Sequence, residues 1–482
     1  MKLFAPLEDL KLLISTSDED RLSALDGVRA LALLWVFALH SAQIPMWVPP
    51  SSMKISEVYI ELKQQWWFQS TIQGGTGVDV FFVLSGLLIS SGYQRIKDPS
   101  FFKRYGSFLS RRFFRIWPMV FAAVMTSVLM GLCISSYSLK NAERVWAYLL
   151  LVPNFVPQSL KKSDISQLWS VGVEMQMYLI TPFVVDLLVS RETGKRRSWA
   201  FLGLAMISAC CVAFRVYLVY GPPQNSVVDT WPPPPLYVNP LARLSPYASG
   251  IAVHFALSDC QKGQSGGTWR RLCSFVVDVL AVSVLALSFF IGSKVLKPPF
   301  FTTNIFSPLA NELMVITWPP LYGWCLARAI FRAITAPKGK DLSEWFNFWC
   351  WFRAFLSSRI WTPLAILSYG AYVLQFIIGR WALPYFLDAV NLSFSGLTRD
   401  DVLPALWRYA VVFLLFTLIG YALALPYHLF VEKPGMRLGK VLSDVISKSR
   451  RAVEAVEEGK VHSSKGQISK GQMEADLEVA GA

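Results

Sequence analysis

Long apolar runs, separated by shorter polar stretches, recur along the whole chain. A helix needs about 20 mostly apolar residues to span a bilayer. Ten segments approach or meet this requirement: 28–47, 76–93, 113–135, 169–189, 199–220, 244–258, 273–293, 307–329, 361–383 and 407–430. The sixth is short and carries Pro246 near its start, so we expect a broken or tilted helix there. The pattern predicts an all-α, polytopic membrane protein with about ten transmembrane helices.

Both ends of the chain are polar. Residues 1–27 include Asp18, Glu19 and Asp20, an acidic run that a cleavable signal peptide does not have. Residues 441–482 are rich in Gly, Ser, Lys and Glu and almost free of aromatic residues, which is typical of disorder. We therefore expect a cytosolic N-terminal segment (1–27), one transmembrane domain (28–440) and a disordered cytosolic tail (441–482).

The composition and the placement of charge support this interpretation. Only 16% of the residues are charged and 54% are hydrophobic, whereas soluble domains carry about 25% charged residues. The net charge of +14 does not indicate a nucleic-acid partner, because the basic residues alternate with apolar segments. If the N-terminus is cytosolic, 32 of the 46 Lys and Arg residues fall inside and 12 outside. The positive-inside rule then predicts that both termini are cytoplasmic.

The seven cysteines form no CxxC pair, and no other spacing in the chain is typical of a metal site. We therefore predict neither a bound metal nor a bound cofactor.

Two ionisable residues, Arg29 and His40, fall in the first apolar segment. Such residues cost about 2.5–3.5 kcal/mol each on insertion scales, so each is a functional candidate. They are eleven residues apart, which is about 20° past three helical turns, so they share a face roughly 16 Å apart along the axis. The alternative is that Arg29 snorkels to the interface and that His40 only packs against another helix.

Histidine is the most common general base near neutral pH, and His40 is the one histidine expected deep in the outer half. His428 and His462 fall at an inner helix end and in the tail. His254, near the inner end of the sixth segment, begins an HxxxxD pattern that ends at Asp259. Glycerolipid acyltransferases carry this pattern, but none of their other motifs follows here. We interpret it as polar residues at a helix end.

A general base needs an orienting partner, and two carboxylates are candidates. Glu174 lies about one and a half turns into the fourth helix, which by parity starts at the outer surface, so it lies close to the predicted depth of His40. Asp79 enters the second helix at a similar level. A carboxylate beside an imidazole fixes its tautomer and raises its basicity. The alternative for Glu174 is a structural hydrogen bond between helices.

Arg112 and Arg115 close the loop between the second and third helices, on the expected cytosolic side, and share a helical face. Guanidinium pairs can grip phosphate groups in a bidentate fashion, which suits a ligand such as coenzyme A. The alternative is a basic cluster that contacts anionic lipid.

Six elements, in order from about residue 21 to 440, resemble those of the acyltransferase 3 family of integral membrane acyltransferases. They are Leu25-Asp26-Gly27-Val28-Arg29-Ala30-Leu31 with His40, Gly77 to Gly86, Arg112-Phe113-Phe114-Arg115, Trp169 to Tyr178, Leu367 to Tyr372, and Glu432-Lys433-Pro434. The resemblance implies that His40 and Glu174 are catalytic and that three arginines, Arg29, Arg112 and Arg115, serve the acyl donor. The same elements supply further candidates: Asp79, Ser85, Trp169 and Ser170.

One position departs from the family pattern. Many relatives carry a histidine in the ninth helix, after the Leu-Ser-Tyr element, where this chain has Gln375. Glutamine cannot act as a base, so any role of that histidine in proton transfer does not carry over.

The family transfers acyl groups, often acetyl, from cytosolic donors to extracytoplasmic acceptors. We therefore expect a membrane acyltransferase that uses acyl-CoA, with acetyl-CoA favoured, as co-substrate and acylates a hydroxyl of a glycan, lipid or small molecule. His40, oriented by Glu174, would deprotonate that hydroxyl for direct attack on the thioester. The alternative is a carrier or flippase whose intramembrane charges line a substrate path. Membrane lipids are expected partners, and the compartment stays open between plasma membrane and endoplasmic reticulum or Golgi.

Overall fold

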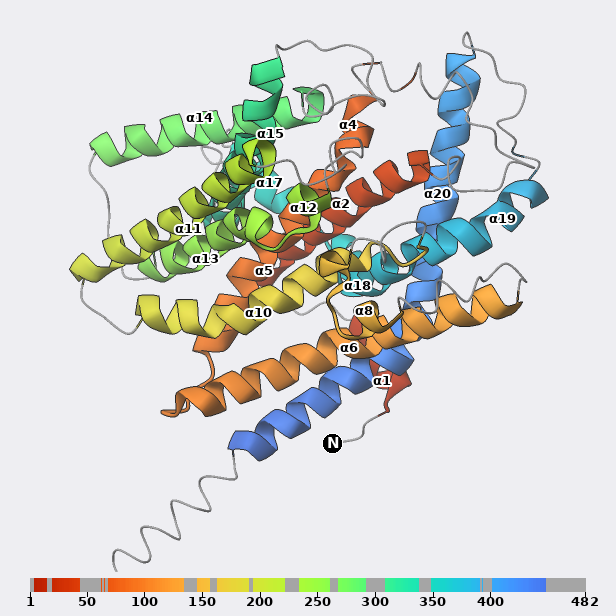
Figure 1. The fold of residues 1–482 in the computed structure, drawn as a ribbon, viewed down its shortest axis with the longest axis horizontal. Helices are drawn as coiled ribbons and strands as arrows, with labels where there is room; N and C mark the ends of the chain where they lie inside the picture. Colours follow the sequence, from red (N-terminus) through yellow and green to blue (C-terminus); the bar gives the residue numbers. More distant parts are fainter. Residues whose placement is uncertain are drawn as a thin grey trace, which may run out of the picture.

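The computed structural model describes residues 4–14, 20–43, 62, 65, 68–133, 145–156, 163–189, 194–221, 234–260, 268–291, 308–337, 348–390, 392 and 401–447 (Figure 1). Helices and the turns between them make up these ranges, and no strand occurs within them. The predicted all-α fold class is confirmed.

Each of the ten predicted segments coincides with a helix. These helices are α2 (Asp20–Gln43), α5 (Gly77–Gln94), α6 (Phe101–Cys133), α10 (Leu168–Val189), α11 (Gly194–Tyr220), α13 (Leu244–Cys260), α14 (Thr268–Ile291), α15 (Pro308–Thr335), α18 (Trp361–Ile377) and α20 (Val402–Tyr427). Within the described residues, seven helices are long and apolar enough to cross a membrane, and α14 contributes a shorter apolar stretch, Ser274–Ser288. The chain is therefore a multi-pass membrane protein, while the count of ten and the side of each terminus remain predictions.

Short helices fill the connections. They are α1 (Pro6–Ile14), α4 (Gln69–Ile72), η2 (Gln73–Thr76), α8 (Val145–Leu149), η3 (Pro153–Phe155), α12 (Pro234–Val238), η5 (Leu241–Arg243), α17 (Phe348–Leu356) and α19 (Leu383–Ala389). Two π-helical turns, η6 (Ile378–Ala382) and η7 (His428–Glu432), follow α18 and α20.

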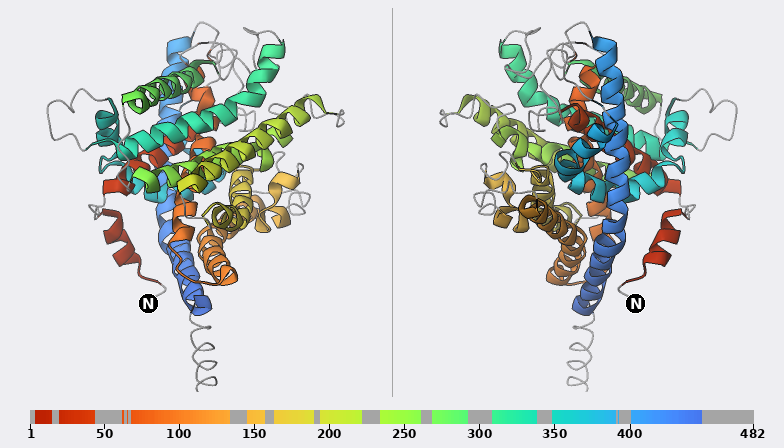
Figure 2. Two further views of the ribbon diagram at one scale, coloured as in Figure 1. Left: turned by 90° about the vertical axis from the view of Figure 1, so that its left-hand side faces the viewer. Right: turned by 90° about the vertical axis from the view of Figure 1, so that its right-hand side faces the viewer.

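Helices run across both predicted boundaries of the transmembrane domain, and the boundaries themselves remain predictions. At the start, α2 begins at Asp20, so the expected boundary after residue 27 falls inside this helix. At the end, the chain stays helical beyond η7 through Ser447, and this continuation extends past the other helices (Figure 2). Residues 441–447 are helical because they pack on α6: Arg111 Nε donates to Ser443 Oγ at 2.7 Å. Residues 448–482 lie outside the described part.

Helix α5 forms the centre of the bundle. In the most apolar 18-residue stretch of Ser70–Gln94, which contains α5, 72% of the residues are buried. The corresponding value for Trp199–Tyr220 of α11 is 22%. Its contact with α13 is close because glycines meet there: a Cβ on Gly86 would lie 2.1 Å from the Tyr247 oxygen, and one on Gly250 would lie 2.0 Å from the Val83 oxygen. Small residues let two membrane helices approach at backbone distance. Every residue on α5 is thereby held at a fixed depth against its neighbours.

The outward faces of the peripheral helices are apolar. Exposed side chains on α11, α14 and α20 include Leu202, Met206, Phe275, Leu280, Leu414 and Leu418. Apolar outer faces suit contact with lipid tails, which agrees with the membrane assignment.

Candidate active site

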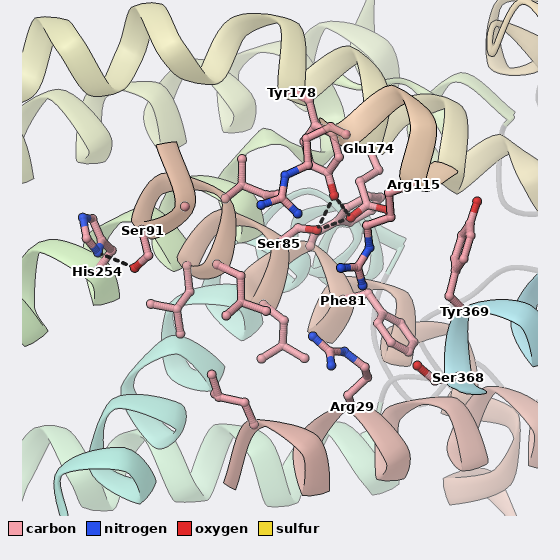
Figure 3. Close-up of a pocket in the computed structure, with 18 of the residues that line it drawn as sticks. Arg29, Phe81, Ser85, Ser91, Arg115, Glu174, Tyr178, His254, Ser368 and Tyr369 are labelled. Atoms are coloured by element: carbon pink, nitrogen blue, oxygen red, sulfur yellow. Dashed lines mark hydrogen bonds between the residues drawn. The ribbon is translucent and has the colours of Figure 1, made fainter. Parts of the chain in front are cut away.

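A cavity of about 1040 Å³ opens between α2, α5, α6, α10, α13 and α18 (Figure 3). Four of the predicted site residues bear charge and line it: Arg29, Arg112, Arg115 and Glu174. Ser85 and Ser170 line it as well. The structure therefore brings six of the ten candidates to one cavity from four different helices.

Ser85, Glu174 and Tyr178 form a hydrogen-bonded cluster in the wall of this cavity. The hydroxyls of Ser85 and Tyr178 both donate to Oε1 of Glu174, and the two hydroxyl oxygens are 3.3 Å apart. Tyr178 follows Glu174 by four residues, so one face of α10 carries both side chains, while Ser85 comes from α5. An ionised carboxylate only accepts hydrogen bonds, so the two donors suit an ionised Glu174.

Three guanidinium groups converge near this cluster. Figure 3 shows Arg29 and Arg115 extending from different helices toward the same space. Arg29 makes a long ion pair of 3.4 Å with Asp26, and Arg29, Arg112 and Arg115 interact electrostatically with one another or with Glu174. Among the described contacts, Arg112 and Arg115 make neither a hydrogen bond nor an ion pair.

The charges in the cavity do not balance. Glu174 is the one carboxylate among the described lining residues, whereas four arginines line the cavity: Arg29, Arg95, Arg112 and Arg115. Arg112 and Arg115, which make no described hydrogen bond or ion pair, favour an anionic ligand or a carbonyl group that becomes negative during a reaction.

A second cavity, of about 520 Å³, adjoins the first because Gly92, Arg95 and Arg112 line both. Its further basic residues are Lys97 and Arg111. It lies where α5 ends and α6 begins, in the connection that the sequence places on the cytosolic side. The two cavities together give a basic entrance and a larger chamber whose mostly apolar lining carries the arginines and Glu174.

His40 lies apart from this cavity and has a different partner from the one expected. Its Nδ1 is 2.7 Å from Oε1 of Gln375, and its ring packs edge-on against Phe376 with centroids 4.6 Å apart. The described contacts of His40 do not include Glu174, because helix packing gives the two residues different neighbours. In the tautomer that donates Nδ1–H to Gln375, Nε2 is the basic nitrogen.

The contacts between α10 and α18 explain the separation. Gln167 donates to the Val373 carbonyl at 2.7 Å, and the Ser170 and Tyr372 hydroxyl oxygens are 2.6 Å apart. From the Ser170–Tyr372 contact, Glu174 lies four residues further along α10. Gln375 lies three residues further along α18, which runs in the opposite direction here. At 1.5 Å per residue, about 10 Å separates their levels. Ser170 and Tyr372 lie between them and line the end of the cavity nearest His40.

Asp79 forms a buried ion pair that sequence reasoning missed. Nη1 of Arg243 lies 2.8 and 3.0 Å from its two carboxylate oxygens, and both side chains are at most 5% exposed. Arg243 also lies 4.4 Å from the Tyr237 ring centroid and 5.8 Å from that of Trp169. Asp79 and Trp169 thus belong to a polar contact between helices, outside the described lining of the cavity. Arg243 is 164 residues from Asp79, and no local signal connects them.

His254 is likewise held by polar side chains that are remote in sequence. Its two ring nitrogens lie 2.7 Å from Ser91 Oγ and 2.6 Å from Gln94 Oε1. Both partners belong to α5, so His254 links α13 to α5 at the cavity wall (Figure 3). This agrees with its interpretation as a polar residue at a helix end. Tyr178 was missed as a candidate, although its four-residue spacing from Glu174 was visible in the sequence.

A comparison with known protein families identifies the family to which this helical bundle belongs. The acyltransferase domain of the acyltransferase 3 family matches residues 22–425. The chain belongs to this family, whose model describes an acyltransferase domain.

Individual relatives are distant. Over 220 residues the chain is 25% identical to "Regulator of hypoxia-inducible factor 1" of Caenorhabditis elegans, covering 44% of this chain and 43% of the relative. It is 22% identical over 475 residues to "Nose resistant to fluoxetine protein 6" of the same species, covering 90% and 53%. It is 27% identical over 209 residues to a "Putative O-acetyltransferase" of Staphylococcus aureus (strain COL), covering 41% and 30%. The chain thus matches about half, or less, of the length of these curated relatives. No solved structure matches it.

Proposed function

We propose that the protein takes an acyl group, with acetyl favoured, from cytosolic acyl-CoA and transfers it to a hydroxyl of a glycan, lipid or small-molecule acceptor. One observation carries this proposal. The cavity of about 1040 Å³ is lined by four guanidinium groups against one carboxylate and adjoins a basic second cavity. The staphylococcal relative carries the name "Putative O-acetyltransferase", which agrees with a hydroxyl acceptor.

The second cavity suits the phosphates of the donor. Arg95, Lys97, Arg111 and Arg112 line it, and guanidinium groups bind phosphate through paired, charge-assisted hydrogen bonds. Arg112 borders both cavities, so the pantetheine arm passes it on the way into the larger one. Arg29 and Arg115 then lie too deep for the phosphates and face the thioester end of the donor.

The chemistry takes place between Glu174 and His40. A thioester beside Ser170 and Tyr372 lies within reach of both levels, because these two residues fill the layer between them. His40 Nε2 removes the proton of the acceptor hydroxyl. The hydroxyl oxygen attacks the acyl carbon, and Arg29 and Arg115 stabilise the negative charge on the donor side. Ser85 and Tyr178, which donate their hydroxyl protons to Glu174, hold that carboxylate in the cavity wall along the path of the leaving thiol.

The experiment is an assay of purified protein in detergent micelles with acetyl-CoA and an extract of membrane lipids and glycans. We expect release of free thiol together with acetylation of a component of the extract. A carrier or flippase also binds a substrate but releases no thiol. Donor binding without thiol release in folded protein would therefore contradict the proposed function.

A further inference from the structure

Burial of the Gln375 side chain at its position costs free energy. Its side chain is 0% exposed, inside α18, among apolar neighbours. Its Nε2 is buried and has no hydrogen-bond partner within the described part of the chain. A buried amide with an unpaired N–H group is less favourable than an apolar side chain of similar volume. Packing alone therefore does not explain a glutamine here.

Among the described residues, the one hydrogen bond of the Gln375 side-chain amide is with His40. Its Oε1 lies 2.7 Å from Nδ1 of the imidazole. The two residues are 335 positions apart in sequence, and α2 and α18 carry them to the same level. Phe376, the next residue on α18, packs edge-on against the imidazole ring. Two consecutive residues of α18 thus restrain both the tautomer and the plane of His40.

Gln375 also lies next to the end of the cavity without lining it. Tyr372, one turn earlier on α18, lines the cavity and is hydrogen-bonded to Ser170. Residues three apart share a helical face, so Gln375 follows Tyr372 outward, toward His40. A substitution at Gln375 changes what surrounds His40 and leaves the described donor-binding surface unchanged.

We propose that Gln375 is a positioning residue for the transfer reaction: its Oε1 accepts Nδ1–H of His40 and so keeps Nε2 as the basic nitrogen that faces the acceptor hydroxyl. This inference rests on the proposed function. The acceptor proton goes to Nε2, the acceptor oxygen bonds to the acyl carbon, and the carbon–sulfur bond breaks. The sulfur leaves with the electron pair and takes up the proton held by His40, which regenerates the neutral imidazole.

Gln375→Leu tests this directly, because it removes the acceptor and nearly preserves the volume. We expect kcat to fall at least tenfold, with an upper limit at the roughly 10²–10⁴-fold of a lost general base. KM for acetyl-CoA should stay within about twofold, because Gln375 does not line the donor cavity. The thermal midpoint should change little, because removal of the unpaired buried N–H offsets loss of the hydrogen bond to His40 Nδ1. A merely structural role predicts another pattern: a clearly lower midpoint with normal kcat in the folded fraction.

Gln375→Glu restores an acceptor at the same reach, so kcat should recover to within about tenfold of the unsubstituted protein. The matched control is Gln73→Leu in η2. Gln73 is also a buried glutamine whose Nε2 has no partner among the described residues, and no described hydrogen bond joins it to His40. Its kcat should stay within about twofold.

Unchanged kcat in Gln375→Leu, or no recovery in Gln375→Glu, would overturn this inference and leave the proposed function standing. Absence of acyl transfer by the unsubstituted protein would overturn both. The assay uses thiol release from acetyl-CoA in micelles that contain the membrane extract, so all variants are compared on one readout.

Discussion

Arg95 and Arg112 line both cavities, and Arg112 makes neither a hydrogen bond nor an ion pair with the described residues. Its guanidinium group lies 5.8 Å from the Phe108 ring centroid, a contact that orients it without neutralising it. Arg115, one turn further on α6, points into the deeper cavity beside Arg29 (Figure 3). The two residues of the Arg-x-x-Arg element therefore contact different parts of the proposed donor.

Arg112→Ala should weaken acetyl-CoA binding about 10–100-fold, because a hydrogen bond to a charged group contributes roughly 1.5–3 kcal/mol. Arg115→Ala should affect kcat more than affinity, and the double variant should lose most binding and turnover. Arg112→Lys rescues affinity only partly, since the paired geometry is lost. The measurement is calorimetric titration of acetyl-CoA. Arg104→Ala is the matched control, because Arg104 lies on α6, pairs with Asp186 at 2.5 Å and lines neither cavity. Unchanged affinity in the folded double variant would return these arginines to a lipid-binding role.

The separation of His40 from Glu174 also has a kinetic consequence. His40→Ala should lose about 10²–10⁴-fold in turnover, and Glu174→Gln should lose turnover through the Ser85–Tyr178 cluster that it holds. Residues that act as one unit are strongly non-additive, whereas distant, independent sites add in free energy. Since the two have different partners, the double variant should show close to the product of the two losses. Single-turnover thiol release measures this; a double variant no slower than His40→Ala would indicate one coupled unit.

At the scale of the elements, buried polar contacts fix how the helices pair. Asp79 and Arg243 join α5 to η5, while the close glycine contacts at Gly86 and Gly250 join α5 to α13. Another buried arginine, Arg215 of α11, donates to backbone carbonyls of Ile316, Leu236 and Ala242 at 3.0–3.3 Å. These contacts hold α5, and with it Ser85, at a defined depth in the cavity wall.

Breaking the Asp79–Arg243 pair should therefore destabilise the bundle. Asp79→Ala or Arg243→Ala leaves one buried charge unpaired, which costs about 3–5 kcal/mol. The double variant should be less destabilised than the sum of the singles, because no unpaired charge remains. Unfolding in mixed micelles measures the difference. The control is Asp444→Ala at the exposed Arg111–Asp444 contact of 3.9 Å, where the loss should stay below about 1 kcal/mol. Equal effects at the two sites would contradict this account.

At the scale of the whole molecule, the basic second cavity and the excess of Lys and Arg in alternate connections make the same prediction. Both predict that the connection between α5 and α6 lies in the cytosol, where acyl-CoA is available. Reporter fusions should therefore give the same side for that connection and for a fusion after residue 447, and the opposite side for a fusion within 385–400. One common side for all three would contradict both the ten-helix topology and the proposed route of the donor.

The hydrophobic pattern was sufficient for the all-α class, since each of the ten apolar segments coincides with a helix. The period and length of such segments are local properties, and helix formation in a membrane satisfies every backbone hydrogen bond within the segment itself. The motifs Arg-x-x-Arg and Trp-Ser-x-x-x-Glu-x-x-x-Tyr were equally readable, and the structure brings Arg112, Arg115 and Glu174 to one cavity. Local sequence therefore determined the elements and most of the charged residues of the candidate site.

Only the tertiary structure decided which side chains meet. Counting residues from the helix ends placed His40 and Glu174 at one depth, but Glu174 pairs with Ser85, 89 residues away, and His40 with Gln375, 335 residues away. Asp79 likewise finds Arg243 rather than the imidazole. The depth and rotation of a membrane helix depend on its packing against neighbours that are remote in sequence. A periodic pattern contains no information on those neighbours, so the pairing of His40 with Gln375 could be known only from the folded bundle.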